Sequence, residues 1–153
     1  MATKVKRFLE QLPEPCLTAE LSSELSSAES RSAIRAMNPD DAAAAILCRV
    51  VALHEPYKST SILLLEHFRR VVANRASNGC TASELAAIFA HLLLCPRAVQ
   101  GVVTNEAALM DWHIHVISLI FACNESIWIR VVKKSGTGDG SLSIRSNLSF
   151  DYA

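Results

Sequence analysis

Five prolines restrict where helices can run in this 153-residue chain, because a proline ring breaks a regular helix at an interior position. Between the prolines, large apolar side chains recur at spacings of three and four, as an amphipathic helix requires. Leu17, Leu21 and Leu25, for example, fall on one stripe of such a helix. The pattern predicts an all-α domain of about six helices. The prolines are Pro13, Pro15, Pro39, Pro56 and Pro96.

Local start and stop signals place these helices. Asn38 is suited to cap a helix in which Pro39 takes the first position, and Thr81 with Glu84 forms a capping box. A helix is therefore expected over each of residues 4–12, 18–30, 39–53, 59–75, 84–94 and 106–125. Residues 127–132 either extend the last helix or form a short strand.

Each predicted helix has an apolar face that we expect to point inward. The members of these faces are Val5, Phe8, Leu9 and Leu12; Ile62, Leu63, Leu65, Phe68, Val71 and Val72; Leu85, Ile88, Phe89, Leu92 and Leu93; and Leu109, Trp112, Val116, Leu119, Ile120 and Cys123.

The chain divides into two regions by composition. Residues 1–134 contain all the predicted helices, with a loop expected at Gly101–Asn105, and form one helical domain. From Ser135 onward Gly and Ser dominate, so residues 135–153 are expected to form a flexible C-terminal tail.

Charge and cysteine usage exclude several classes of protein. Fifteen basic side chains balance fifteen acidic ones, which gives no support to a nucleic-acid partner or a membrane-surface role. The longest nearly apolar stretch, Ile114–Cys123, is too short to span a bilayer. The N-terminus lacks the apolar core of a signal peptide, so a cytoplasmic location is expected. The five cysteines, Cys16, Cys48, Cys80, Cys95 and Cys123, are expected to be buried free thiols.

No common catalytic or cofactor motif occurs in the sequence. Phosphate-binding glycine loops, zinc-protease motifs and serine-hydrolase elbows are missing, so no cofactor is expected. His113 and His115 are two residues apart on a predicted helix and point in nearly opposite directions, so they cannot share a metal ion. No metal site is predicted.

Two strings in the sequence resemble the Rho GTPase-activating (RhoGAP) domain family. The first is residues 5–18, VKRFLEQLPEPCLT, which is similar to that family's Lys, Phe-Leu-Arg and Leu-Pro-Glu-Pro-Leu signature. The second combines residues 59–71, STSILLLEHFRRV, with Asn78–Thr81 and Leu85–Phe89. It resembles a helix of the family, the Asn-Lys-Met-Thr turn and the following helix. The two strings occur in the family's order and at about its spacing.

This resemblance implies a RhoGAP-like helical bundle and, as partner, a Rho-family small GTPase of the Rho, Rac or Cdc42 type. RhoGAP domains insert an arginine into the GTPase, where the cation stabilises the transferred phosphoryl group. In the family that arginine lies in a loop before the lysine-bearing helix. Here Met1 to Val5 precede Lys6, so the resemblance implies a bundle truncated at its N-terminus. We expect about the C-terminal two thirds of the domain, without the arginine finger and with no other catalytic residue.

Four residues are implied to contact the partner. Lys6 keeps the family's lysine, whereas Glu10 reverses the charge of the arginine in Phe-Leu-Arg. Asn78 keeps the first residue of the Asn-Lys-Met-Thr turn, whose lysine is Gly79 here. Leu92 replaces the family's asparagine near the switch region of the GTPase.

Three functional hypotheses remain open at this point. The first is a module that binds a Rho-family GTPase without accelerating its reaction. The second is an active GTPase activator that uses a non-standard basic residue, Arg7 or Lys6. The third is a truncated fragment or isoform whose exposed apolar helix faces make it an oligomerising interaction domain.

Overall fold

The computed structural model describes residues 2–12, 14–94 and 106–134. These residues form helices only, with no strand among them, which confirms the predicted all-α class. They make more helices than the six expected from the sequence. The elements are α1 (Ala2–Gln11), α2 (Ala19–Ser26), α3 (Ala28–Ala36), α4 (Pro39–Val51), α5 (Tyr57–Ala73), α6 (Arg75–Asn78), α7 (Ala82–Leu94), α8 (Glu106–Ala122), α9 (Glu125–Trp128) and the π-helical turn η2 (Ile129–Lys133).

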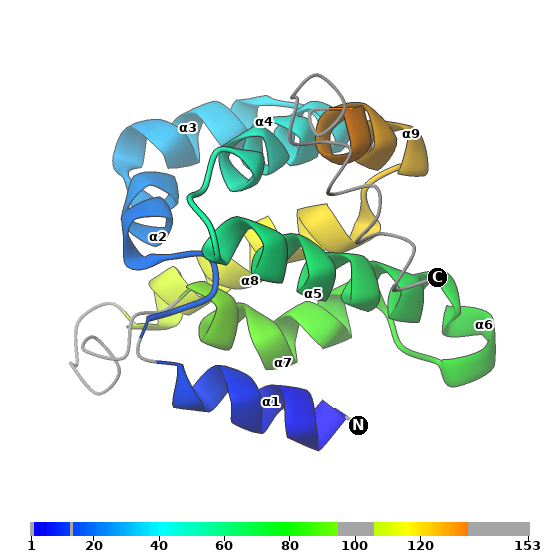
Figure 1. Ribbon diagram of the computed structural model, residues 1–153. Helices are drawn as coiled ribbons and strands as arrows, with labels where there is room; N and C mark the ends of the chain where they lie inside the picture. Colours follow the sequence, from blue (N-terminus) through cyan, green and yellow to red (C-terminus); the bar gives the residue numbers. More distant parts are fainter. Residues whose placement is uncertain (1, 13, 95–105, 135–153) are drawn as a thin grey trace.

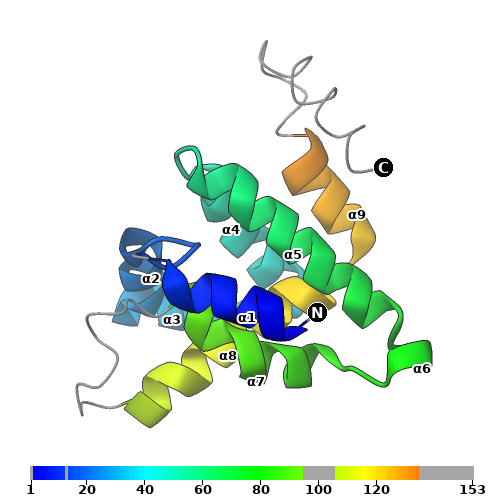
Figure 2. The same cartoon turned by 60° about the horizontal axis from the view of Figure 1, so that its bottom comes forward.

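Helix α8 is the centre of the bundle. It packs most extensively against α7 and also against α4 and α5 (Figure 1). Helices α2 and α3 join α4 on one side of α8, whereas α1 packs on the outer side of α7 (Figures 1 and 2). The segment α9–η2 returns to α4, so the two ends of the described chain lie on different sides of the bundle.

The core is formed by apolar side chains from every described helical element except α6. Phe68 of α5 is its aromatic centre, with ring centroids 4.6 Å from Phe89 and 5.3 Å from Phe121. Leu17, Leu21 and Leu25 are all buried, as their spacing predicts. The indole N–H of buried Trp112 donates to the carbonyl oxygen of Leu25 at 2.9 Å, which joins α8 to α2.

Two predicted helix starts are confirmed by their hydrogen bonds. The side chain of Asn38 accepts from the backbone N–H of Asp41 at 2.9 Å, ahead of Pro39. In the capping box, Thr81 accepts from the Glu84 N–H at 3.2 Å and Glu84 accepts from the Thr81 N–H at 3.1 Å.

Several predicted helix boundaries are wrong: α1 begins at Ala2 instead of residue 4, α4 ends at Val51 instead of 53, and α7 begins at Ala82 instead of 84. The helix expected over 18–30 is divided at Ser27, whose extended backbone ends α2 and caps α3. The helix expected over 59–75 begins earlier, at Tyr57 of α5, because Pro56 already has helical dihedral angles. The helix expected over 106–125 ends at Ala122, where the chain bends by 93° into residues 125–133. Those residues are helical, so the strand alternative for 127–132 is also wrong.

Some expected core positions lie on the surface. Phe8 is 48% exposed and Ile88 is 53% exposed, although both have the spacing of their buried neighbours. Leu63 is exposed too, and Val5, Leu12, Ile62, Val71, Val72, Leu92, Leu119 and Cys123 are only partly buried. Each of these side chains lies on a side of its helix that the neighbouring helices cover only in part. Buried residues that the predicted faces omitted include Ser61, Arg69, His113, Ile117 and Phe121.

The cysteine prediction is correct for one of the four described thiols. All four are free, but only Cys16 is buried, Cys80 and Cys123 are partly buried and Cys48 is exposed. Cys95, the loop expected at Gly101–Asn105 and the tail expected at 135–153 lie outside the described residues. Within the described ranges no single helix is long and apolar enough to cross a bilayer; α8 and residues 125–133 reach that length only together, across the 93° bend.

Candidate functional site

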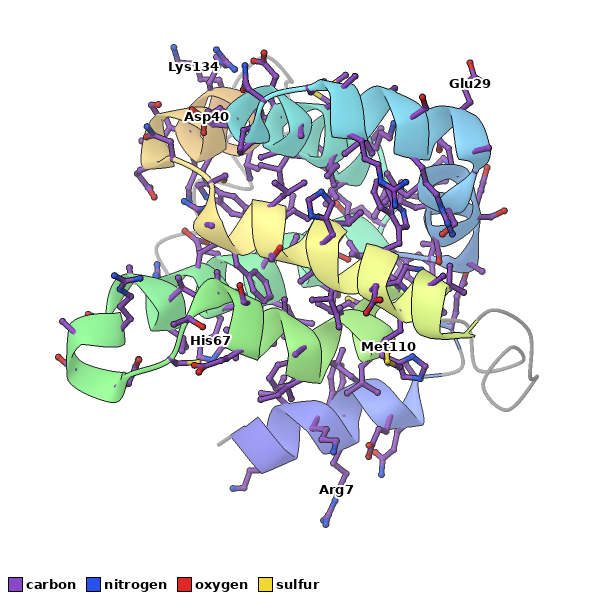
Figure 3. All side chains as sticks on the ribbon, turned by 180° about the vertical axis from the view of Figure 1, so that it is seen from behind. Arg7, Glu29, Asp40, His67, Met110 and Lys134 are labelled. Carbon is purple, nitrogen blue, oxygen red and sulfur yellow. The ribbon has the colours of Figure 1, made fainter. Side chains whose placement is uncertain are left out.

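The predicted site begins on α1. Buried Leu9 faces inward, and α1 packs on α7. Lys6 and Glu10 are both exposed, and because they are four residues apart they lie on one side of the helix. Arg7 is also exposed, and Figure 3 shows its side chain projecting away from the bundle. The helix therefore presents a lysine and a glutamate side by side, with an arginine on a neighbouring side.

The corner after α1 is anchored to two other helices. The buried hydroxyl of Ser61, on α5, donates to the carbonyl oxygen of Cys16 at 2.7 Å. The Cys16 thiol lies 3.3 Å from the same hydroxyl, and burial raises the pKa of this thiol. The Leu17 N–H donates to the carbonyl oxygen of Leu93, on α7, at 3.2 Å. These bonds hold Cys16 and Leu17, the residues after the corner, to α5 and α7.

A second set of contacts holds the far side of the corner. Thr18 has φ = 66°, an uncommon value for a β-branched residue, and its hydroxyl accepts from the Leu21 N–H at 3.2 Å. The Glu14 carboxylate accepts from the Ala19 N–H at 3.1 Å. A hydrogen bond to the same carboxylate raises the pKa of Tyr57, at the start of α5. Glu14 thus joins the corner to both α2 and α5.

Asn78 shapes the turn between α6 and α7. Its amide donates to the carbonyl oxygen of Val71 at 2.9 Å, and its side-chain oxygen accepts from the Cys80 N–H at 2.8 Å. Gly79 follows with φ = 71°, the left-handed conformation that glycine adopts most readily. Both ends of the Asn78 side chain are therefore engaged in the turn itself. Its role in partner contact stays a prediction.

The four predicted partner-binding residues do not form one cluster. Lys6 and Glu10 share a side of α1, and half-buried Leu92 lies toward the C-terminal end of α7, the helix on which α1 packs. Asn78 is at the end of α6, which lies beyond the N-terminal end of α1 in both Figure 1 and Figure 2. The structure thus brings together the α1 residues and the helix that carries Leu92, and keeps Asn78 apart.

Sequence reasoning missed a buried arginine on α5. Arg69 is only 9% exposed and donates to the carbonyl oxygens of Ile120 and Cys123 at 3.0 and 2.9 Å. It also pairs with Glu125 at 3.0 Å, and its guanidinium lies over the Trp128 ring. The interaction closes the bend between α8 and α9. The sequence did contain a signal for this buried arginine, because Arg69 lies four positions after Leu65 and therefore on the apolar face of the helix.

His113 and His115 point to different environments, as their spacing predicts. His113 is buried, with Nε2 3.4 Å from the hydroxyl of Ser26, and burial lowers its pKa to about 4, assisted by the nearby positive charges of His91 and Arg31. His115 is exposed. Among the residues that the structure describes, no group of three or more His, Cys, Asp or Glu side chains is placed to hold a metal ion.

Comparison with known proteins gives one match. A family model of the RhoGAP domain matches residues 1–98, well over half of the chain. The match includes α1, the corner after it, and the helices up to α7. Neither the curated proteins nor the solved structures that were searched gave a match.

Proposed function

The chain belongs to the RhoGAP domain family, and from this premise we propose that it binds a Rho-family small GTPase without accelerating GTP hydrolysis. Family membership relates the chain to the regulation of Rho GTPases. In this proposal the side of α1 that bears Lys6 contacts the GTPase, and α7 with Leu92 lies next to it. The observation that carries it is an exposed Lys6 on a helix whose exit is fixed by hydrogen bonds to α5 and α7.

The fixed position of α1 favours binding. A lysine on a rigid, exposed helix can meet an acidic surface without first losing the freedom of a loop. The corner supplies this rigidity, because the Cys16 carbonyl oxygen is bonded to α5 and the Leu17 N–H to α7. Glu10, on the same side, sets a local charge opposite to that of the family's arginine.

The arginines of the described residues argue against catalysis. An arginine that acts on the GTPase must reach the transferred phosphoryl group. Every arginine within residues 2–12, 14–94 and 106–134 lies inside a helical element, and none is at the tip of a loop. Arg7, the basic neighbour of Lys6, is in the middle of α1 and projects to solvent (Figure 3).

The test is a matched pair of charge reversals on α1. Lys6→Glu is expected to weaken binding to GTP-loaded Rho-family GTPases at least about tenfold, because a lysine at the contact becomes a repelling carboxylate. Arg7→Glu makes the same change in net charge on a neighbouring side of α1 and is expected to leave the affinity within about threefold of the unchanged chain. Isothermal titration calorimetry measures the affinities, and light scattering establishes that each sample is monodisperse.

Two outcomes would contradict the proposal. One is a monodisperse, folded chain that binds none of the GTP-loaded Rho-family proteins. The other is an equal loss of affinity in Lys6→Glu and Arg7→Glu, which would show that only overall charge matters and that Lys6 makes no specific contact.

A further inference from the structure

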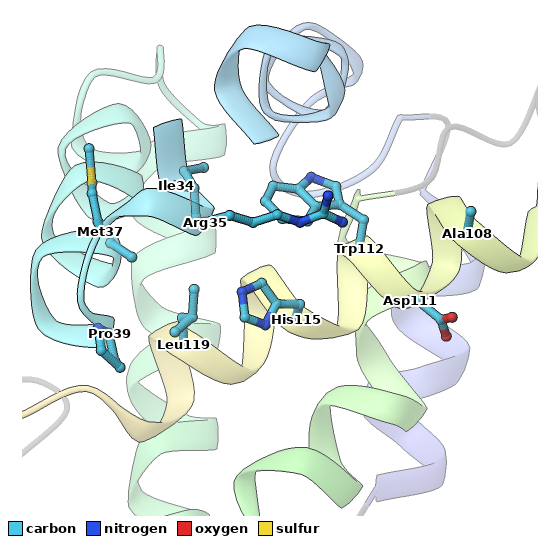
Figure 4. A pocket seen from close by; sticks show the side chains of 10 residues that line it. Ile34, Arg35, Met37, Pro39, Ala108, Asp111, Trp112, His115 and Leu119 are labelled. Atoms are coloured by element: carbon cyan, nitrogen blue, oxygen red, sulfur yellow. The ribbon is translucent and has the colours of Figure 1, made fainter. Parts of the chain in front are cut away.

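A groove runs along α8 on the side that faces α3 and α4. Its larger part, about 490 Å³, is lined by residues of α3, α4 and α8 and by the joint between α3 and α4 (Figure 4). A smaller part, about 220 Å³, continues toward the C-terminal end of α8. The two parts share Pro39, His115 and Leu119, so they form one groove. No residue of α1 lines it, so it is separate from the surface discussed above.

The walls of the larger part of this groove are mostly apolar, whereas Asp40, Ser83, His115 and Ser118 make the smaller part about half polar. Ile34, Met37, Pro39 and Leu119 line its larger part, and the Met37 side chain is 41% exposed. Methionine is common on surfaces that bind peptides, because its side chain adapts to different partners. These walls favour a ligand that has apolar side chains along one face.

The two ends of the groove differ in charge. At one end the Arg35 guanidinium lies 5.2 Å from the centre of the Trp112 ring and has no ion pair or hydrogen bond within the described part of the chain. Asp111 also lines this part, but Figure 4 shows its carboxylate pointing away from Arg35. At the other end Asp40, in the first turn of α4, contributes a carboxylate.

The length of the groove favours a peptide segment over a small molecule. The lining residues extend along α8 from Ala108 to Ala122. At 1.5 Å per residue this is about 21 Å, or about four helical turns. Arg35 and Asp40 both line this groove, so a ligand lying along α8 meets a positive and a negative charge. A helix with acidic residues in its first turn and basic residues in its last also has the charge order that its own dipole favours.

We propose that this groove binds an amphipathic helix of a partner protein. The apolar face of that helix packs on Met37 and Leu119, its acidic end pairs with Arg35, and its basic end lies near Asp40. The mode is that of a helix docked in a hydrophobic groove. It adds a second interaction surface to the GTPase-binding surface proposed above and does not depend on it.

The experiment uses a fluorescent, 16-residue amphipathic probe with Glu in its first turn and Lys in its last. Its binding to the full chain is measured by fluorescence polarisation, beside a probe with Gln at the charged positions. Arg35→Glu is expected to weaken binding of the charged probe at least about tenfold and to leave the Gln probe within about threefold. Arg7→Glu, the matched charge control far from the groove, is expected to leave both affinities unchanged.

A steric pair of variants tests the location. Ala108→Trp blocks one end of the groove and is expected to weaken binding at least about tenfold, whereas Ala87→Trp places the same side chain on an exposed position of α7 and is expected to leave it unchanged. Circular dichroism establishes that both variants fold.

Equal binding by the two variants, or no saturable binding by the folded chain, overturns the proposal. A dimer that dissociates in Arg35→Glu also overturns it, since the occupant is then a second copy. Lys6→Glu should leave probe binding intact, so failure of the GTPase proposal is distinguishable.

Discussion

Single polar residues decide much of the internal order of this bundle. Arg69 is the clearest case, because one guanidinium satisfies two backbone carbonyl oxygens, pairs with Glu125 and covers the Trp128 ring. A buried charge of this kind is tolerated only where its donors are satisfied. Arg69 therefore belongs to the structural framework, and its proximity to the Cys123 thiol is a consequence of the bend that it closes.

His113 gives the molecule a pH dependence at the residue scale. The pKa of the folded-state imidazole is about 4, against 6.5 in its ordinary state, so the unfolded chain takes up the proton first as the pH falls. The stabilisation from neutral His113 is thus complete above about pH 6.5 and is lost as the pH falls toward 4.

This dependence is testable with His113→Gln. The difference in free energy of unfolding between the unchanged chain and the variant is expected to be largest above pH 6.5 and to shrink steadily down to pH 4. Urea unfolding followed by circular dichroism at several pH values measures it. The same substitution at exposed His54 controls for the loss of an imidazole. A difference that stays constant from pH 8 to pH 4 would refute the assignment.

At the scale of elements, the Ser61 hydroxyl supplies one of the bonds that join the corner after α1 to the bundle. Ser61→Ala removes the donor to the Cys16 carbonyl oxygen and leaves that oxygen buried without a partner. We expect a loss of about 1–3 kcal/mol in the free energy of unfolding. Ser59→Ala, two residues earlier, removes an exposed hydroxyl bonded to Glu55 and is expected to cost about 0.5 kcal/mol or less. Equal losses in urea unfolding would show that the Ser61 hydrogen bond does not stabilise the corner.

Two helix caps were predicted correctly from local signals. Asn38 and the pair Thr81–Glu84 act within one helical turn, and both caps are present. Ser27 also acts locally, since its hydroxyl accepts from the Ser30 N–H and donates to the Glu24 carbonyl oxygen. Its capping role was missed because serines surround it and the leucine spacing continues up to Leu25.

At the scale of the whole molecule, the proposed function predicts binding without turnover. In a single-turnover assay, an equimolar amount of the chain is expected to change the rate of GTP hydrolysis less than about threefold, compared with roughly 10³–10⁵ for an arginine supplied in trans. Because both would occupy the same face of the GTPase, the chain should also slow the reaction catalysed by an active RhoGAP domain. Acceleration of about a hundredfold or more would refute the proposal and direct attention to Arg7 and Lys6.

The sequence alone determined the all-α class, the capped helix starts and the family. These features depend on residues within a few positions of one another, where the spacing of side chains along a helix is fixed by its geometry. The Leu-Pro-Glu-Pro corner is likewise a local property, since its prolines restrict the backbone directly.

Only the tertiary structure decided which faces are covered and which polar groups are paired. Ser61 meets Cys16 across 45 positions of the sequence, and Arg69 meets Glu125 across 56. Phe8 and Ile88 have the same helical spacing as their buried neighbours, yet they are exposed because no other described helix covers that side. The groove along α8 exists only because α3 and α4 pack beside it. Such contacts depend on the relative position of whole helices, which helical periodicity does not specify.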